Sequence, residues 1–342
     1  MKKQLFFSFL LCVFLNNNCT ITNKLFKDVE LYPVVEPYQE GYLQVTDLHE
    51  IYYAQFGNPQ GKPVLVIHGG PGGGCSKELT KMFDLDFYRV IMFDQRGAKR
   101  SRPFASMVDN TPQAAVEDME TIREYLAIEK WFVFGGSCGS MLSILYGETH
   151  PGRVIGFILR GIFLGREKEY EHLFYGMNKF FPEAWQDMVN LLPENERDDL
   201  IPALHKRVMD PDPEIYIPIA YSFMFYDCLC ARLCSDHSYV KRVLTYETAL
   251  SIGRAFIHYS ANRFFFEENQ LLNNIKKINH LPAIMVQGRY DLICPPENAY
   301  DLYKEWPGSK LWFVSNGGHS MGDPAITQGL KIAMEEMKDI HF

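Results

Sequence analysis

Three side chains of this 342-residue sequence have the types and settings that nucleophilic catalysis requires, namely Ser137, Asp291 and His319. A serine hydroxyl is a weak nucleophile at neutral pH, so it needs an imidazole to take its proton. The imidazole in turn needs a carboxylate that fixes its tautomer and stabilises its positive charge. We therefore predict a triad in which Ser137 is the nucleophile, His319 is the base and Asp291 orients the base.

Other residues could fill two of these roles. His68 is an alternative base, and Asp94 and Asp301 are alternative acids. His68 directly precedes a run of glycines, so we expect it to brace that loop instead of accepting a proton. The first assignment is favoured because each of its three residues lies in a positioned motif.

The serine lies between a predicted strand and a predicted helix. Residues 131–134 are all apolar, which is typical of a strand that is covered on both faces. Gly-x-Ser-x-Gly follows at 135–139, and apolar residues at helical spacing continue to residue 145. This context predicts a nucleophile elbow, in which two glycines permit the tight turn and a strained serine holds its hydroxyl out of the sheet.

A glycine-rich loop at 68–74 follows another apolar strand, which we predict at 64–67. The glycines expose backbone N–H groups and permit close approach. A phosphate-binding loop is not favoured, because the lysine of the Gly-x-x-x-x-Gly-Lys pattern is absent. We predict an oxyanion loop in which the N–H groups of Gly70 and Cys138 hold the tetrahedral oxyanion.

The remaining pattern predicts an α/β fold. A hairpin is expected over 41–56, and a helix over 111–127 begins with Thr111 as N-cap and Pro112 at its first position. Further buried strands are predicted at 88–93, 154–159, 283–286 and 311–314. Strands that alternate with helices indicate a mostly parallel sheet with helices on both faces. Asp291 and His319 follow the ends of two strands, where such sheets bind ligands.

Several longer motifs resemble the proline iminopeptidase family of α/β-hydrolases, which are serine peptidases. The order Ser137, Asp291, His319 is that of an α/β-hydrolase. The likeness extends from about residue 35 to 340, and its main motifs are His-Gly-Gly-Pro-Gly (68–72), Asp-Gln-Arg-Gly (94–97), Gly-Gly-Ser-x-Gly-Ser (135–140), Leu-Arg-Gly-Ile-Phe (159–163), Gly-Arg-Tyr-Asp (288–291) and Gly-His-Ser (318–320). The resemblance implies an aminopeptidase that releases N-terminal proline from short peptides and needs no cofactor or metal.

The resemblance also implies an α/β-hydrolase fold with an inserted helical cap. We predict an N-terminal extension at 1–27, a first part of the core at 28–163, the cap at 164–270 and a second part of the core at 271–342. Prolines within the cap are expected to divide it into short helices, and these are Pro182, Pro193, Pro202, Pro211, Pro213 and Pro218. Asp227, Cys230, Cys234 and His237 would share one helical face, but four ligands from one helix rarely converge, so we predict no metal.

Family members are expected to hold the substrate ammonium with acidic cap residues. Asp227, in the pair Tyr-Asp at 226–227, is the nearest match to a Trp-Glu pair of the family. Phe256 stands where a second acid is expected, and Cys294 matches a family cysteine near the proline ring. The resemblance therefore implies substrate contacts by Asp227, Phe256 and Cys294, with an ammonium site that depends mainly on Asp227.

Two further departures from the family pattern concern the catalytic region. Cys138 stands where the family usually has tryptophan, which preserves the backbone N–H but alters the pocket wall. Ala-Lys at 98–99 stands where the family normally has two small residues after Asp-Gln-Arg-Gly. Because a triad does not choose between acyl substrates, an esterase, amidase or lactonase is an alternative function. A ligand-binding protein of the same fold without catalysis is an alternative of another class.

Composition restricts the partners. The chain is 47% hydrophobic and 22% charged, and its net charge of −8 includes no long basic run, which argues against nucleic acid. No stretch reaches the roughly 18 apolar residues of a spanning helix, so no stable membrane insertion is expected. The predicted partners are small peptides with N-terminal proline, and nothing in the sequence indicates an oligomeric state.

The N-terminal segment leaves two localisations open. The apolar run 5–15 after Lys2 and Lys3 resembles a signal peptide, but three asparagines follow and no cleavage site is evident. The eight cysteines lack a regular disulfide spacing, which favours a reducing compartment. We predict a cytoplasmic protein, with export through this segment, or lipid anchoring on Cys19, as the alternative.

Overall fold

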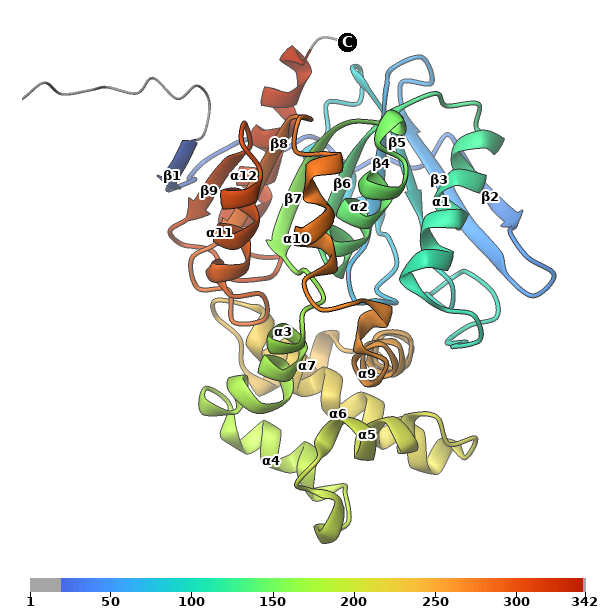
Figure 1. Cartoon of the computed structure of the whole chain (residues 1–342), viewed down its shortest axis with the longest axis vertical. Helices are drawn as coiled ribbons and strands as arrows, with labels where there is room; N and C mark the ends of the chain where they lie inside the picture. Colours follow the sequence, from blue (N-terminus) through green and yellow to red (C-terminus); the bar gives the residue numbers. More distant parts are fainter. Residues whose placement is uncertain (1–19, 341–342) are drawn as a thin grey trace, which may run out of the picture.

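A nine-stranded sheet organises the structure, which is a computed structural model describing residues 20–340 (Figure 1). The strand order across the sheet is β1-β9-β8-β7-β6-β4-β5-β3-β2. The strands are β1 (Thr20–Lys24), β2 (Gln39–Gln44), β3 (Glu50–Gly57), β4 (Lys62–Ile67), β5 (Tyr88–Phe93), β6 (Trp131–Ser137), β7 (Val154–Ile162), β8 (Ala283–Gly288) and β9 (Lys310–Val314).

The sheet is mostly parallel. Neighbouring strands from β1 across to β5 run parallel, whereas β5 with β3 and β3 with β2 are antiparallel. Every residue of β7 is buried, because helices cover both faces of the central strands. The predicted hairpin is confirmed as β2 and β3, and the predicted parallel strands are confirmed as β4 to β9.

Two helical layers cover the sheet. One face carries α1 (Pro112–Tyr125), α2 (Cys138–Thr149), α10 (Gln270–Asn274) and α11 (Pro296–Glu305). The other face carries the 3₁₀ helix η1 (Lys77–Met82) and α12 (Pro324–Glu336). The predicted start of α1 is confirmed, because Thr111 Oγ1 accepts the N–H of Ala114 at 3.1 Å and Pro112 is the first helical residue.

The segment between β7 and α10 forms a separate group of helices beyond the carboxyl end of β7 (Figure 1). Its helices are α3 (Glu167–Glu171), α4 (Pro182–Asn190), α5 (Leu200–Val208), α6 (Pro213–Ala231), α7 (His237–Val243), α8 (Tyr246–Thr248) and α9 (Arg254–Ala261), with the π-helical turn η6 (Ala249–Gly253) before α9. We call this group the cap. Its boundaries at residues 164 and 270 stay predictions.

Helix α6 is longer than the sequence analysis expected. Pro218 was expected to end a helix, and this was wrong, because α6 continues through Pro218 to Ala231. Proline inside a helix costs about 3 kcal/mol, but the buried residues of α6, among them Phe223 and Met224, offset this penalty. Because α6 ends at Ala231, Cys234 and His237 do not share its face with Asp227, so the spacing considered for a metal does not form on one helix.

The sheet also includes a strand that the sequence analysis did not predict. Strand β1, within the segment assigned to the N-terminal extension, pairs in parallel with β9 at the sheet edge. Phe26, just after β1, is buried with its ring centroid 6.1 Å from that of Trp312, which anchors the segment. The apolar run 5–15 and Cys19 lie outside the described residues.

The cysteines within residues 20–340 are all free thiols, and they are Cys75, Cys138, Cys228, Cys230, Cys234 and Cys294. None of the described helices is long and apolar enough to span a membrane.

Candidate active site

Ser137 occupies a sharp turn between β6 and α2. Its φ of 59° and ψ of −132° lie in a strained region for a residue with a side chain. A Cβ atom on Gly135 would lie 2.2 Å from Ser143 Oγ, and one on Gly139 would lie 2.3 Å from the carbonyl oxygen of Ile67. Both glycines are therefore needed for the close approach of strand, turn and helix, as the sequence pattern predicted.

The loop that carries Gly70 is fixed through its carbonyl groups. Gly69 O accepts the Nδ1–H of His68 at 2.8 Å and the N–H of Gly73 at 3.0 Å. These bonds orient the peptide unit whose N–H belongs to Gly70. Cys138 adds a third restraint, because its thiol donates to Gly70 O at 3.0 Å. The predicted oxyanion residues Gly70 and Cys138 are thus brought together at the start of α2.

His68 is a bracing residue, in agreement with its expected role. Its Nε2 accepts the backbone N–H of Gln95 at 2.9 Å, so the lone pair that a base would use is occupied. Burial lowers the pKa of His68 to about 4, and this keeps the ring neutral. His68 therefore holds the glycine-rich loop in place through its hydrogen bonds and is not free to accept a proton from Ser137.

Asp291 and His319 form a direct pair. His319 Nδ1 lies 3.0 and 2.9 Å from the two carboxylate oxygens of Asp291, and both residues are buried. The carboxylate also accepts the N–H of Cys294 at 2.8 Å and an Nε2–H of Gln287 at 3.2 Å. Gln287 is held in turn, because its Oε1 accepts the N–H of Ile162 at 3.0 Å. Asp291 is therefore fixed as an acceptor for Nδ1–H, which leaves Nε2 of a neutral ring as the basic nitrogen.

Arg160 on β7 lies beside that basic nitrogen. Its Nη1 is 3.2 Å from His319 Nε2 and donates to the carbonyl oxygen of His319 at 2.8 Å. The guanidinium is buried, and its Nε has no hydrogen-bond partner among the described residues. Ser137 and His319 line the same cavity, but within residues 20–340 no hydrogen bond joins their side chains. Such bonds are often long in structures without a substrate.

The cavity above Ser137 has a volume of about 270 Å³ and lies between the core and the cap. Its polar side chains include Ser137, Arg160, Asp227 and His319. Its apolar lining comes mainly from the cap, and the large side chains are Leu173, Phe223, Met224, Ile252, Phe256, Ile293 and Met321. Asp227 and Phe256 therefore lie where the sequence analysis expected substrate contacts.

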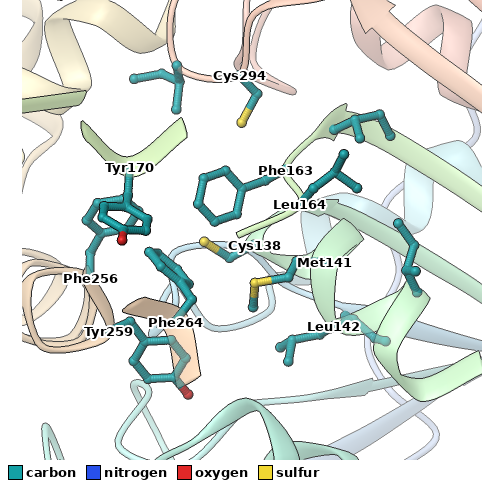
Figure 2. Packing of buried hydrophobic residues seen from close by; sticks show 14 of the residues in the cluster. Cys138, Met141, Leu142, Phe163, Leu164, Tyr170, Phe256, Tyr259, Phe264 and Cys294 are labelled. Atoms are coloured by element: carbon teal, nitrogen blue, oxygen red, sulfur yellow. The ribbon is translucent and has the colours of Figure 1, made fainter. Parts of the chain in front are cut away.

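The thiols of Cys138 and Cys294 have a different setting. Both residues are fully buried, and neither lines the 270 Å³ cavity. Figure 2 shows their sulfur atoms among the aromatic side chains of the adjoining core, with Phe163, Phe256 and Phe264 nearby. Cys294 contributes its backbone N–H to Asp291, so a direct contact between its thiol and substrate stays a prediction.

Phe256 takes part in an aromatic cluster at the junction of cap and core. Its ring centroid lies 5.5 Å from those of both Phe223 and Phe264, and 6.3 Å from that of Phe174. These contacts fix the Phe256 ring as one wall of the cavity. The wall is apolar and suits an aliphatic ring of a substrate.

Asp227 is the only carboxylate that lines this cavity among the described residues. Burial raises the pKa of Asp227 to about 6, with a smaller opposing effect from His319 and a further rise from Asp291. A carboxylate in this setting is stabilised by a cation that enters the cavity. A perturbed acid that shares a cavity with a serine and a histidine is typical of a functional site.

The alternative acids are engaged elsewhere. Asp94 accepts the N–H of Cys75 at 2.7 Å and pairs with Arg100 at 2.6 Å. Asp301 pairs with Arg166 at 2.9 Å and with Lys304 at 3.0 Å. Neither acid lines the cavity, whereas Asp291 contacts the imidazole of His319 directly.

Two residues of this site, Arg160 and Gln287, were not predicted from the sequence. Arg160 had a signal, since it is a charged residue in an otherwise apolar strand and belongs to the motif at 159–163. Gln287 had a weaker one, as a polar residue at the end of β8, four residues before Asp291. Neither position reveals its role, because Arg160 contacts His319 and Gln287 is held by Ile162, and both of these partners are distant in the sequence.

The fold and the site together define an α/β-hydrolase, and a family model for the α/β hydrolase fold matches residues 62–323. Solved structures of the same fold include an esterase from Rhodococcus sp. ECU1013, with a TM-score of 0.60 and 17% identity over 88% of this chain and 99% of that chain. An esterase from Exiguobacterium antarcticum has a TM-score of 0.57 and 19% identity over 88% of this chain and 100% of that chain. At these identities the likeness concerns the fold alone.

Several proteins have a much higher sequence identity to this chain than these solved structures do. A probable proline iminopeptidase from Leptolyngbya boryana is 45% identical over 88% of this chain and 94% of its own length. Proline iminopeptidases from Arabidopsis thaliana and Xylella fastidiosa are 42% and 41% identical, over 90% and 89% of this chain and 82% and 98% of their own lengths. The chain belongs to the proline iminopeptidase family.

Proposed function

We propose that this protein is a serine aminopeptidase that releases N-terminal proline from peptides. The observation that carries this proposal is the position of Asp227, a half-buried carboxylate in the cavity that also contains Ser137 and His319. The relatives named proline iminopeptidase support the same activity. An enzyme for simple esters has no need for a desolvated acid at this position, whereas an aminopeptidase must hold an ammonium group near the scissile bond.

In the first half of the reaction Ser137 Oγ attacks the carbonyl carbon of the N-terminal residue. His319 Nε2 takes the hydroxyl proton, and Asp291 stabilises the resulting imidazolium through Nδ1–H. The N–H groups of Gly70 and Cys138 stabilise the oxyanion, since both belong to a loop or helix start that is fixed before the substrate arrives. When the intermediate collapses, His319 gives its proton to the departing peptide amine.

In the second half water attacks the acyl-enzyme, and His319 acts as base again. Free proline leaves and Ser137 regains its proton. Arg160 Nη1 lies 3.2 Å from the nitrogen that must accept the serine proton, so its hydrogen bond to Nε2 must yield to the Ser137 hydroxyl in the reacting complex. No step requires a metal or a cofactor.

Asp227 supplies the preference for a free amine. The positive amine of the substrate and the negative carboxylate both lose water in this cavity, and each reduces the desolvation penalty of the other. Phe256 and its apolar neighbours accept the carbon atoms of the pyrrolidine ring. A residue with a bulky side chain fits less well into a cavity of about 270 Å³ that these groups already line.

We expect Asp227→Asn to raise KM for a prolyl arylamide and to lower kcat/KM by a factor that corresponds to about 2–5 kcal/mol of activation free energy, because no carboxylate then pairs with the substrate ammonium. Hydrolysis of an aryl acetate, which has no amine, is expected to stay almost unchanged. Steady-state kinetics on both substrates measure the difference. An equal loss on both substrates would instead make Asp227 a structural residue, and a wild-type preference for the ester would favour the esterase alternative.

The same variant has an expected effect on stability. The pKa of Asp227 is raised above its unfolded value, so the protonated acid favours folding and this contribution is lost as pH rises through about 6. At pH 8 Asp227→Asn is therefore expected to stabilise the protein, by on the order of 2 kcal/mol after allowance for solvent in the cavity. Asp212→Asn, at the exposed N-cap of the same helix, is the matched control, and it should change neither activity nor stability.

The pKa of Asp227 also predicts the pH dependence of substrate choice. Below about pH 6 the free enzyme carries a neutral Asp227 that no longer attracts an ammonium. The ratio of kcat/KM for the prolyl arylamide to that for the aryl acetate should therefore fall about tenfold per pH unit below this value. The ratio removes the contribution of His319, which both reactions share. A ratio that stays constant from pH 8 to 4.5 would contradict a role for Asp227 in amine binding.

A further inference from the structure

The loop that carries His319 is bonded directly to the end of helix α6, which carries Asp227. The N–H of Ser320 donates to Ala231 O at 2.8 Å, and Arg232 Nη2 donates to Gly322 O at 3.1 Å. Ala231 is one helical turn, or about 6 Å of axial rise, beyond Asp227. The base and the amine-binding acid are therefore joined through a short path of backbone.

Asp323, which follows His319 in the same loop, makes further contacts between this loop and the residues after α6. Its Oδ2 accepts the N–H of Gly318 at 3.0 Å and the N–H of Leu233 at 3.2 Å. Its Oδ1 lies 3.7 Å from Nε of Arg232. A single buried carboxylate thus binds the residue before His319 and two residues that follow α6.

The orientation of Asp323 is unusual for its place in the chain. Asp323 is the N-cap residue of α12, a position where an aspartate side chain usually accepts an N–H of its own helix. Here the side chain makes no such bond and turns away to Gly318 and Leu233. Helix α12 therefore lacks a side-chain hydrogen bond at its N-cap, and the carboxylate instead joins the His319 loop to the residues that follow α6.

The contact is also sterically specific. A Cβ atom on Gly318 would lie 2.8 Å from Asp323 Oδ2 and 2.9 Å from the backbone nitrogen of Leu233. Only glycine allows the three groups to meet at this distance. The backbone on both sides of His319 is thus held, before it by Asp323 at the N–H of Gly318 and after it by Arg160 at the carbonyl oxygen of His319.

We propose that Asp323 is a positioning residue that couples amine recognition to catalysis by holding Asp227 in a fixed place relative to His319. This inference rests on the proposed aminopeptidase function. When Asp323 is removed, the end of α6 and the His319 loop can move apart. A substrate that depends on both Asp227 and His319 then loses more than a substrate that depends on His319 alone.

A double-mutant cycle with Asp323→Ala and Asp227→Asn tests the coupling with a prolyl arylamide and an aryl acetate. We expect Asp323→Ala to lower kcat/KM for the arylamide about 100-fold in the wild-type background but only about 10-fold in the Asp227→Asn background. For the aryl acetate the loss should be about 10-fold in both backgrounds. Asp212→Asn again serves as the control that changes an N-cap aspartate without touching the loop.

Two results would overturn the proposal: an equal loss on both substrates in both backgrounds, or no loss at all. If Asp323→Ala does not fold by circular dichroism, Asp323→Ser replaces it in the same cycle, since serine restores a favourable N-cap for α12 but removes the carboxylate oxygen that accepts both N–H groups. A wild-type enzyme without activity on prolyl arylamides would reject the proposed function itself. An active wild type without coupling would reject only the role of Asp323.

Discussion

Replacing Ser137 by alanine is expected to lower kcat on a prolyl arylamide by about 10⁴-fold or more, because the variant retains the cavity but has no nucleophile. Covalent labelling by a fluorophosphonate should disappear in the same variant. The fold should persist, since the change removes one oxygen atom that makes no hydrogen bond to another side chain among the described residues. Thermal unfolding of the purified variant measures this directly.

Ser143→Ala is the matched control for the nucleophile. Ser143 is on α2, the helix that follows Ser137, and its Oγ donates to Gly139 O at 2.6 Å, outside the cavity. Its loss should reduce stability by about 1 kcal/mol and leave labelling and turnover close to those of the wild type. Normal turnover in Ser137→Ala, or labelling of the protein at another serine, would contradict the assignment of the nucleophile.

Local sequence patterns were sufficient for the elements that carry the triad. The apolar run at 88–93 became β5 with the same limits, and the pattern around Ser137 became strand, turn and helix. The reason is that a central parallel strand is apolar on both faces and that the elbow has no room for side chains at its glycines. Both features can be recognised from the residue types of the segment itself, even though the neighbour of Gly139, Ile67, is distant in the sequence.

Local patterns failed where distant contacts decide the conformation. Pro218 has the sequence signature of a helix end, yet α6 continues because its buried face packs within the cap. Strand β1 has no signature of its own, and it forms against the free edge of β9 while Phe26 packs on Trp312. In both cases tertiary contacts override a local preference.

The residues of the candidate site also differ in whether the sequence alone is sufficient to predict them. The sequence predicted the candidate triad, since Ser137, Asp291 and His319 lie in recognisable motifs, and the structure places Asp291 against His319 and His319 in the same cavity as Ser137. It did not predict Arg160, Gln287 or Asp323, because each of these residues depends on a hydrogen bond to a distant part of the chain. Residues that position a catalytic group are therefore found only once the three-dimensional neighbours are known.

The second large effect is expected for the base. His319→Ala should reduce kcat about as much as Ser137→Ala, because the hydroxyl cannot be activated without a proton acceptor and the two residues act as a unit. Pre-steady-state release of the arylamine measures the loss in the acylation step directly. A variant that retains a tenth of the wild-type rate would show that another group takes the proton.

Asp291→Asn is expected to cost somewhat less, on the order of 10³-fold in kcat, because the base remains but its tautomer is no longer fixed. The carboxylate receives hydrogen bonds from His319, Gln287 and the N–H of Cys294, so an amide group must oppose at least one donor. If the amide N–H₂ faces Nδ1, the ring carries its proton on Nε2 and cannot accept one from Ser137. Asp301→Asn, which removes an acid paired with Arg166 and Lys304 instead, should leave kcat almost unchanged. A reversed order of these two losses would transfer the orienting role to Asp301.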